Sequence, residues 1–176
     1  MERGNNVRPL AMSLTVLGAI LRLLPHPPNF APVGGMSLYA GARLRTWQAF
    51  ALPLLLMAVT DPLLGGYSAA TPFIYSSFMI SVWIGRRLTA TESPLRIGAA
   101  CLACSVQFFV LTNFGTWLLG TWYAHTWAGL AACYTAAIPF FGRTLAGDLF
   151  YSAVLFGLHA WLSRTVRRAE RIPAAA

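Results

Sequence analysis

The sequence carries little charge, and none of it comes from lysine. Only 10% of its 176 residues are charged, and 13 basic residues, all of them arginine, outnumber five acidic residues. A soluble domain usually carries about 25% charged residues, whereas 57% of this chain is hydrophobic. A soluble fold of this size could not hide so much apolar surface from water, but a lipid bilayer accepts it. The composition therefore predicts an integral membrane protein.

Residues that carry chemistry are also scarce. The three cysteines, Cys101, Cys104 and Cys133, do not form a disulfide framework of the secreted kind. Cys101 and Cys104 have a redox or metal spacing, but they lie in an apolar segment without a second ligand pair and are interpreted as small apolar residues. His125 and His159 lack a ligand spacing, and the chain has no P-loop. We expect no catalytic site, no metal and no cofactor, so any energy from ATP must come from a partner.

The positions of the arginines predict how the chain crosses the membrane. Eleven of them fall in the termini or in every second connection between apolar segments (Arg3, Arg8, Arg43, Arg45, Arg86, Arg87, Arg96, Arg164, Arg167, Arg168 and Arg171). Cytoplasmic connections are enriched in arginine, so we expect an even number of spans, most simply six, with both termini in the cytoplasm. The net charge of +8 is then explained by control of the membrane topology and by attraction to anionic membrane lipids. We therefore expect no nucleic-acid partner.

We expect one integral membrane domain over residues 1–176, an all-α bundle of about six transmembrane helices. The expected spans are 10–24, 30–42, 47–64, 72–84, 97–119 and 139–162. No small-residue cleavage site follows the first apolar stretch, so it is interpreted as an uncleaved span. No sequence repeat is visible, which does not support an inverted-repeat transporter.

The second expected span is too short for an ordinary membrane helix. Residues 30–42 provide roughly two-thirds of the ~20 residues that a span needs, and they include Pro32 and the pair Gly34-Gly35. Irregular backbone at membrane depth is tolerated only inside protein or along a polar cavity. The outer connections, at 25–32, 61–71 and 120–137, hold most of the unusual residues. We therefore expect an outward-facing pocket, with residues 30–42 in its wall.

Two acidic residues lie closest to the membrane interior. A charge at bilayer depth is costly and normally faces a partner or a cavity. Asp61 precedes Pro62 and either caps a helix or contacts a ligand. Asp148 either pairs with Arg143, five residues earlier, or faces the pocket. Arg22 either reaches the outer head groups, binds an anionic ligand, or neutralises Asp61 or Asp148.

Five neutral side chains complete the expected ligand site. His26 and Asn29 lie in the Pro-rich outer connection, and Tyr75 lies in the short, partly polar fourth span. Asn29 and Asn113 each offer donors and an acceptor that orient a polar ligand or cap backbone groups. Trp117 belongs to a group of aromatic residues that forms an interfacial belt or stacks on a planar ligand.

Small side chains share one face of the first span. Ala11, Thr15 and Ala19 follow at spacings of four residues, which lets another helix approach closely. This face serves either internal packing or the docking of a membrane partner.

Several strings of residues together resemble a bacterial family of small membrane proteins catalogued as a domain of unknown function. They are Arg22-x-x-Pro25-His26-Pro27-Pro28-Asn29-Phe30-x-Pro32-Val33-Gly34, Asp61-Pro62, Pro72-Phe73-x-Tyr75-x-Ser77-Phe78, Thr112-Asn113-Phe114-Gly115-x-Trp117, Cys133-Tyr134-x-Ala136-Ala137-Ile138-Pro139-Phe140-Phe141 and Gly147-Asp148-Leu149-x-Tyr151. That family is distantly similar to the S components of energy-coupling-factor transporters. The resemblance implies an S-component-like bundle in the bacterial inner membrane, which binds a vitamin-like molecule from outside and is served by a transmembrane energising partner and ATPases.

The sequence leaves three functions open. The first is capture and transport of a small vitamin-like solute, with a pocket lined by Arg22, His26, Asn29, Asp61, Tyr75, Asn113, Trp117 and Asp148. The second is a membrane enzyme that uses Asp61, Asp148 and His26, although the chain lacks a clustered His/Asp/Glu set. The third is a structural or assembly subunit of a membrane complex, in which the polar residues pair with one another and leave no pocket. We take the first as the working hypothesis.

Overall fold

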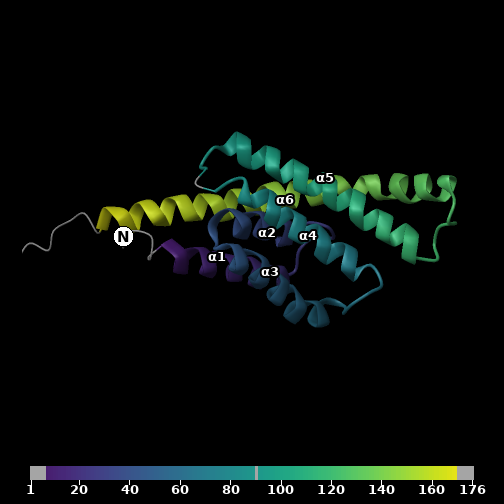
Figure 1. Ribbon diagram of the computed structural model, residues 1–176, viewed down its shortest axis with the longest axis horizontal. Coiled ribbons are helices and arrows are strands. Elements are labelled where there is room, and N and C mark those ends of the chain that lie inside the picture. Colours follow the sequence, from purple (N-terminus) through teal and green to yellow (C-terminus); the bar gives the residue numbers. More distant parts are fainter. Residues whose placement is uncertain (1–6, 90, 170–176) are drawn as a thin grey trace, which may run out of the picture.

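The protein is all-helical in the part of the chain that the structure describes, residues 7–89 and 91–169 of a computed structural model. This part contains six α-helices, one short 3-10 helix and no strand (Figure 1). The elements are α1 (Val7–Leu23), α2 (Val33–Arg43), α3 (Thr46–Thr60), η1 (Asp61–Leu64), α4 (Thr71–Arg86), α5 (Pro94–Leu119) and α6 (Trp127–Ala169). The all-α class expected from the sequence is confirmed. Helices α1 to α5, with η1 completing α3, begin and end within three residues of the first five expected ranges.

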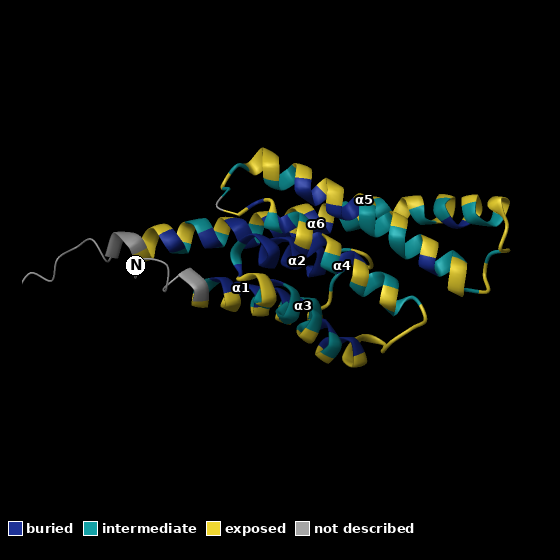
Figure 2. Ribbon diagram, in the orientation of Figure 1, coloured by how far each residue is buried: buried dark blue, intermediate teal, exposed yellow. Residues whose placement is uncertain are grey.

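Helix α2 forms the centre of the bundle. All of its residues from Val33 to Ala42 are buried (Figure 2), and it contacts each of the other five α-helices. Three of its 11 residues are glycine and two are alanine. These small side chains let the neighbouring helices approach its backbone closely. A helix that is apolar all round and wholly buried is a core helix rather than a lipid-facing one.

Helices α2 and α4 approach each other closely at two glycines. A Cβ atom added to Gly41 would overlap the carbonyl oxygen of Val82, and one added to Gly85 would overlap the carbonyl oxygen of Leu38. The two helix backbones therefore touch where neither helix has a side chain. Since no flexible side chain separates them, neither glycine position has room for even a methyl group.

Arginine side chains join the helix ends at one end of the bundle. Arg86 donates to the carbonyl oxygen of Leu44 at 3.0 Å and to the Thr46 hydroxyl at 2.9 Å. Arg43 donates to two carbonyl oxygens of the α4–α5 connection, at 3.3 and 2.6 Å. The start of α1 and the end of α6 lie at this same end, because successive α-helices alternate in direction (Figure 1). We call it the arginine-rich end.

Helix α6 begins earlier than expected. The sequence predicts a connection over 120–137 and a last span over 139–162, but the helix starts at Trp127, and Pro139 lies inside it. Residues 131–137 contain four alanines, and alanine has the highest helix propensity. These alanines favour a helix before Pro139, although an internal proline removes one backbone hydrogen bond and strains the preceding turn. At 43 residues, α6 is about 64 Å long.

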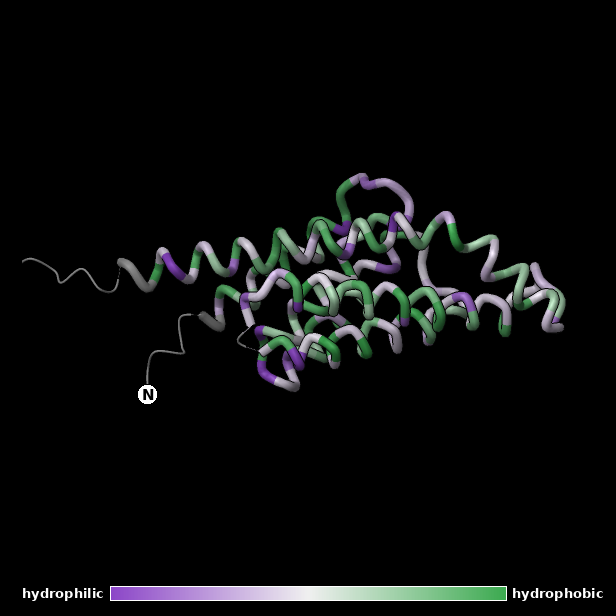
Figure 3. Tube along the Cα trace, turned by 90° about the horizontal axis from the view of Figure 1, so that it is seen from above, coloured by the Kyte–Doolittle hydropathy of each residue, from purple (hydrophilic) through white to green (hydrophobic). Residues whose placement is uncertain are grey.

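Three helical segments of the described chain are long and apolar enough to cross a membrane. They are Thr46–Leu64, Pro94–Leu119 and Trp127–Val166, and hydrophobic residues predominate along the helices (Figure 3). The number is lower than the expected count of about six. The reason is length: α1, α2 and α4 have 17, 11 and 16 residues, which corresponds to about 26, 17 and 24 Å against a hydrocarbon core of about 30 Å.

Candidate functional site

Asp148 lies at the midpoint of α6 and meets the start of the central helix α2. Its side chain is buried, with 5% of the residue exposed. The Ser105 hydroxyl of α5 donates to its Oδ2 atom at 2.6 Å, and the backbone amide of Gly35 interacts with the same carboxyl group. A Cβ atom on Gly34 would overlap this carboxyl group. The glycine pair therefore lets a carboxyl group of α6 reach the backbone of α2.

This arrangement satisfies backbone groups that α2 leaves free. The first amides of a helix have no partner within it, and the N-cap residue of α2, Pro32, provides no side-chain acceptor. Asp148 supplies an acceptor at the positive end of the helix dipole. The alternative of an ion pair between Arg143 and Asp148 is not realised, because Arg143 is exposed and the ion pairs of the described residues join other side chains.

A cavity of about 230 Å³ lies beside Asp148 and is bounded by five helices and the α1–α2 connection. Three residues expected at the ligand site, Arg22, Asn29 and Asp148, line it. The remaining lining residues are Ala31, Val33, Gly34, Ile74, Phe78, Ser81, Cys104, Phe108 and Thr144. We call this the Asp148 cavity. As the sequence predicts, the segment after Pro28 is irregular up to Pro32, and residues of this segment form part of its wall.

A second cavity of about 390 Å³ adjoins the first and shares Asn29, Phe108 and Thr144 with it. It lies between the second half of α5 and the first half of α6. Asn113 lines it, together with Phe109, Thr112, Thr116, Trp122, Ala137, Phe140 and Phe141. The amide nitrogen of Asn113 donates to the carbonyl oxygen of Phe109 within its own helix at 2.7 Å. The same side chain also carries an amide oxygen, which is a hydrogen-bond acceptor.

Arg22, Asp61 and Tyr75 come together near the Asp148 cavity. Arg22 Nη2 donates to Asp61 Oδ1 at 2.5 Å, and the Tyr75 hydroxyl donates to Asp61 Oδ2 at 2.6 Å. The second terminal nitrogen of Arg22 donates to the Thr60 hydroxyl at 2.6 Å. Of the alternatives open for Arg22, the structure realises the neutralisation of Asp61. Asp61 and Tyr75 line neither cavity, so this cluster holds the ends of α1, α3 and α4 together.

Two further residues of the expected site lie apart from both cavities. Trp117 donates from its indole nitrogen to the carbonyl oxygen of Ala124 at 2.9 Å, and its ring contacts Phe114 and His125. It therefore closes the α5–α6 connection. His26 lies in the α1–α2 connection, with Nδ1 3.2 Å from the carbonyl oxygen of Pro27. In the part of the chain that the structure describes, no group of three or more His, Cys, Asp or Glu side chains could hold a metal ion.

Comparisons with known proteins place the chain in a family. The sequence profile of a family of unknown function (DUF6580) matches residues 3–172. The chain belongs to this family. No curated protein and no solved structure matches the chain. The resemblance to an uncharacterised family is thus confirmed, whereas the comparisons provide no similarity to the S components of energy-coupling-factor transporters.

Several residues around the Asp148 cavity were not singled out from the sequence. Ser105 and Gln107 of α5 and Ser81 of α4 are polar residues within apolar helices, which was the signal that could have found them. Gln107 of α5 donates to the Ser77 carbonyl oxygen at 2.9 Å and to the Ser81 hydroxyl at 3.0 Å. These bonds hold α4 against α5 along one wall of the cavity. The spacing alone does not show which face of each helix turns inward.

The small-residue face of α1 is used for internal packing. Ala11 and Thr15 are fully buried, and Ala19 is 4% exposed. Gly18 lies beside them, and a Cβ atom at that position would touch the Met36 side chain of α2 at 3.0 to 3.2 Å. Of the two alternatives for this face, the structure realises packing against the protein's own core. Because these residues are buried within the protein, they are not accessible to a membrane partner.

Proposed function

We propose that this protein is a membrane-embedded binding protein for a small polar solute, which occupies the Asp148 cavity. The observation that carries this proposal is a cavity of about 230 Å³ bounded by five helices, with a buried carboxyl group at its side. Although larger cavities exist on the bundle, this one combines convergent polar groups with a buried carboxyl group, and such polar groups fix the orientation of a ligand.

The polar groups around the cavity retain capacity for a ligand. A carboxylate has about four acceptor positions, of which the Ser105 hydroxyl and the Gly35 amide use two. A guanidinium has five N–H donors, and the bonds of Arg22 to Thr60 and Asp61 use two of them. The solute that fits best therefore presents a donor or cation to Asp148 and an acceptor to Arg22 or Asn29.

The size of the space limits the solute. A dry cavity of about 150 Å³ holds benzene, so the Asp148 cavity accommodates a single-ring compound with substituents. Drug-sized ligands occupy about 300–1,000 Å³, and a larger, vitamin-like molecule must extend past Asn29 and Thr144 into the adjoining cavity. Phe108, which lines both cavities, offers an aromatic surface at their junction.

Uptake is the role that we propose for this binding. The arginine-rich end then faces the cytoplasm of a bacterial inner membrane, in accordance with the positive-inside rule, and the solute enters from the opposite side. Since the chain has no P-loop, active uptake requires a transmembrane energising partner and ATPases, as in transporters with separate S components. Burial of Ala11, Thr15 and Ala19 means that such a partner docks elsewhere on the bundle.

A structural or assembly subunit is the second candidate. It is favoured by the Arg22–Asp61–Tyr75 cluster, in which three polar side chains satisfy one another. A purely structural protein has no need of the Asp148 cavity, so filling that cavity separates the two candidates.

Thr144→Phe tests the proposal directly. Thr144 lines both cavities, and its hydroxyl donates to the Phe140 carbonyl oxygen of its own helix at 3.2 Å. Thr135→Phe is the matched control, because Thr135 is exposed on the same helix, makes the equivalent bond to Ala131 at 2.8 Å and lines neither cavity. Thermal unfolding of the detergent-purified protein is measured with a panel of vitamins and their precursors.

The proposal expects at least one solute to raise the melting temperature of the wild type and of Thr135→Phe, but not of Thr144→Phe. A solute shift that survives in Thr144→Phe would place binding elsewhere. The absence of any shift across the panel, together with unchanged folding of Thr144→Phe, would favour the structural candidate.

A further inference from the structure

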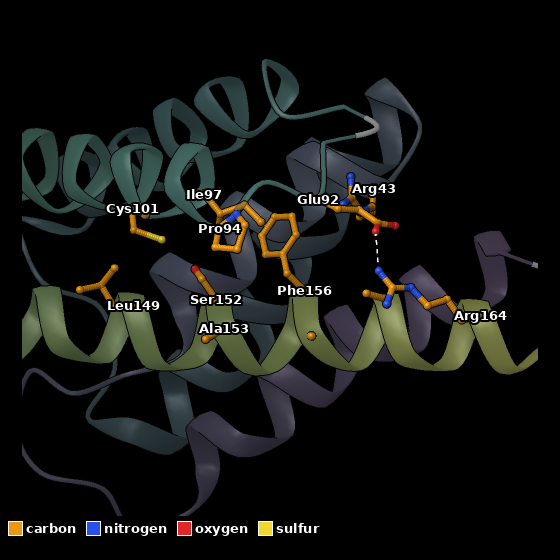
Figure 4. Close-up of a pocket in the computed structure, with 13 residues that line it drawn as sticks. Arg43, Glu92, Pro94, Ile97, Cys101, Leu149, Ser152, Ala153, Phe156 and Arg164 are labelled. Carbon is orange, nitrogen blue, oxygen red and sulfur yellow. Dashed lines mark hydrogen bonds and ion pairs between the residues drawn. The ribbon is translucent and has the colours of Figure 1, made fainter.

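A separate cavity of about 320 Å³ lies between the first half of α5 and the second half of α6 (Figure 4). It shares no lining residue with the two cavities described above. Its walls are mainly apolar: Pro94 and Ile97 of α5 face Leu149, Ala153, Phe156 and Gly157 of α6. We call it the α5–α6 groove. It is a feature that solute binding at Asp148 does not require.

The groove opens sideways, toward the surroundings of the bundle. Leu149, Ala153 and Gly157 are exposed and follow at spacings of four residues along α6, so they form one continuous strip on that helix. Both helices that form the groove belong to segments long and apolar enough to cross a membrane. In a bilayer this opening therefore faces lipid chains rather than water.

Charged residues lie at one end of the groove. Arg43, Glu92 and Arg164 meet there, at the arginine-rich end (Figure 4). Arg164 and Glu92 form an ion pair at 2.9 Å, and both side chains are at least half exposed, so this pair is readily rearranged. The guanidinium of Arg43 donates to two backbone carbonyl oxygens and lies 5.1 Å from the centre of the Phe156 ring. Two arginines against one glutamate leave this end positive.

We propose that the α5–α6 groove holds one acyl chain of an anionic phospholipid, whose phosphate lies against Arg43 and Arg164. An acyl chain gains little free energy when it moves from the surrounding lipid into an apolar groove. The affinity therefore comes mainly from the charged end, and the groove determines where the acyl chain lies. Basic pockets between membrane helices at the cytoplasmic side suit anionic head groups. Along α6 the distance from Arg164 to Leu149 is about 22 Å. This length accommodates a head group and a chain that reaches through one leaflet of about 15 Å.

Glycine substitutions test the occupation of the groove. A Cβ atom on Gly157, Gly98 or Gly142 meets no other atom within 4 Å, so a larger side chain at each position has room. Gly157 and Gly98 line the groove from opposite helices, whereas Gly142 of α6 does not. The phospholipids that co-purify with the wild type, Gly157→Phe, Gly98→Phe and Gly142→Phe in mild detergent are extracted and quantified by mass spectrometry.

The proposal expects phosphatidylglycerol or cardiolipin to be enriched over phosphatidylethanolamine on the wild type and on Gly142→Phe. The two groove-filling variants, Gly157→Phe and Gly98→Phe, should lose this enrichment. If Gly157→Phe does not fold, the lipid content of Gly98→Phe tests the proposal. Arg164→Gln lowers retention of the anionic lipid about fivefold, which corresponds to the ~1 kcal/mol expected for one arginine at a membrane surface. Glu92→Gln raises retention, because it removes the competing carboxylate. Equal retention of zwitterionic lipid, or full retention by both groove-filling variants, would overturn the proposal.

Discussion

The substitution Asp61→Asn tests the contact that joins α1, α3 and α4. It leaves the Arg22 guanidinium without a carboxylate in a place where the two side chains are only 17% and 11% exposed. Breaking a buried ion pair by removing one partner costs about 3–5 kcal/mol, and an exposed pair contributes about 0–1 kcal/mol. Since this pair is partly buried, we expect a loss of about 2–3 kcal/mol in the free energy of unfolding.

A double-mutant cycle isolates the interaction from the effects of each substitution alone. Arg22→Met keeps a long apolar side chain, so the double variant Arg22→Met/Asp61→Asn removes both charges. We expect it to be about 2 kcal/mol more stable than the sum of the single effects predicts. The measurement is reversible unfolding in mixed micelles, followed by circular dichroism. Arg143→Met is the control, because Arg143 is exposed, and its effect should stay within about 0.5 kcal/mol. Additive single effects, within about 0.5 kcal/mol, would refute the assignment of Arg22 and Asp61 as a coupled pair.

Three further predictions concern the backbone and the cysteines. Gly41→Ala should prevent folding or destabilise the protein severely, since the added methyl group would overlap the Val82 carbonyl oxygen. Gly142→Ala is the control: its methyl group meets no atom, so it should be neutral or stabilise the protein by up to about 1 kcal/mol. Thermal unfolding of the two variants compares them. Asn29 has a left-handed backbone conformation, with φ of 64°. Asn29→Val should therefore lower the free energy of unfolding by about 1–3 kcal/mol, and Asn29→Gly by much less. A glycine variant less stable than the valine variant in the same assay would contradict the left-handed conformation. A thiol reagent should label the folded protein only slowly and the unfolded protein fully, because all three cysteines are buried (Cys101, Cys104 and Cys133); rapid labelling of the folded protein would contradict this packing.

The existence and order of the helices could be predicted from local information. Apolar runs separated by prolines, glycines and arginines indicate where helices α1 to α5 begin and end, because burial and turn formation depend on neighbouring residues. The start of α6 could not be read in this way. Pro139 is typical of a first helical turn, which favours a start at that residue over a start before the alanines of residues 131–137. The helix that begins at Trp127 shows that this proline is internal.

The candidate site depends on contacts between distant residues, which a single sequence does not reveal. Arg22 and Asp61 are 39 residues apart, and Ser105 and Asp148 are 43 residues apart. A charged residue in an apolar segment signals that a partner exists, but the rotation of each helix decides which partner it is. Thus Arg22 was open to pairing with either acid, and Arg143 was the expected partner of Asp148, whereas the partner in the structure, Ser105, was not singled out from the sequence.

The burial of α2 could be predicted only in part. Its shortness and its glycines indicate a segment that lies inside protein, since an 11-residue helix cannot cross a bilayer. The sequence does not show that Gly34 faces Asp148 or that Gly41 faces Val82. Those contacts need the backbones of α4 and α6 in place.

Native mass spectrometry of the detergent-purified protein tests most directly whether the Asp148 cavity binds a small solute. The account predicts a retained small molecule, or one taken up from a panel of vitamins and precursors, on the wild type and on Thr135→Phe but not on Thr144→Phe. An apo mass that no solute changes, in protein whose Thr144→Phe variant folds as well as the wild type, would contradict the account and leave the bundle with a structural role.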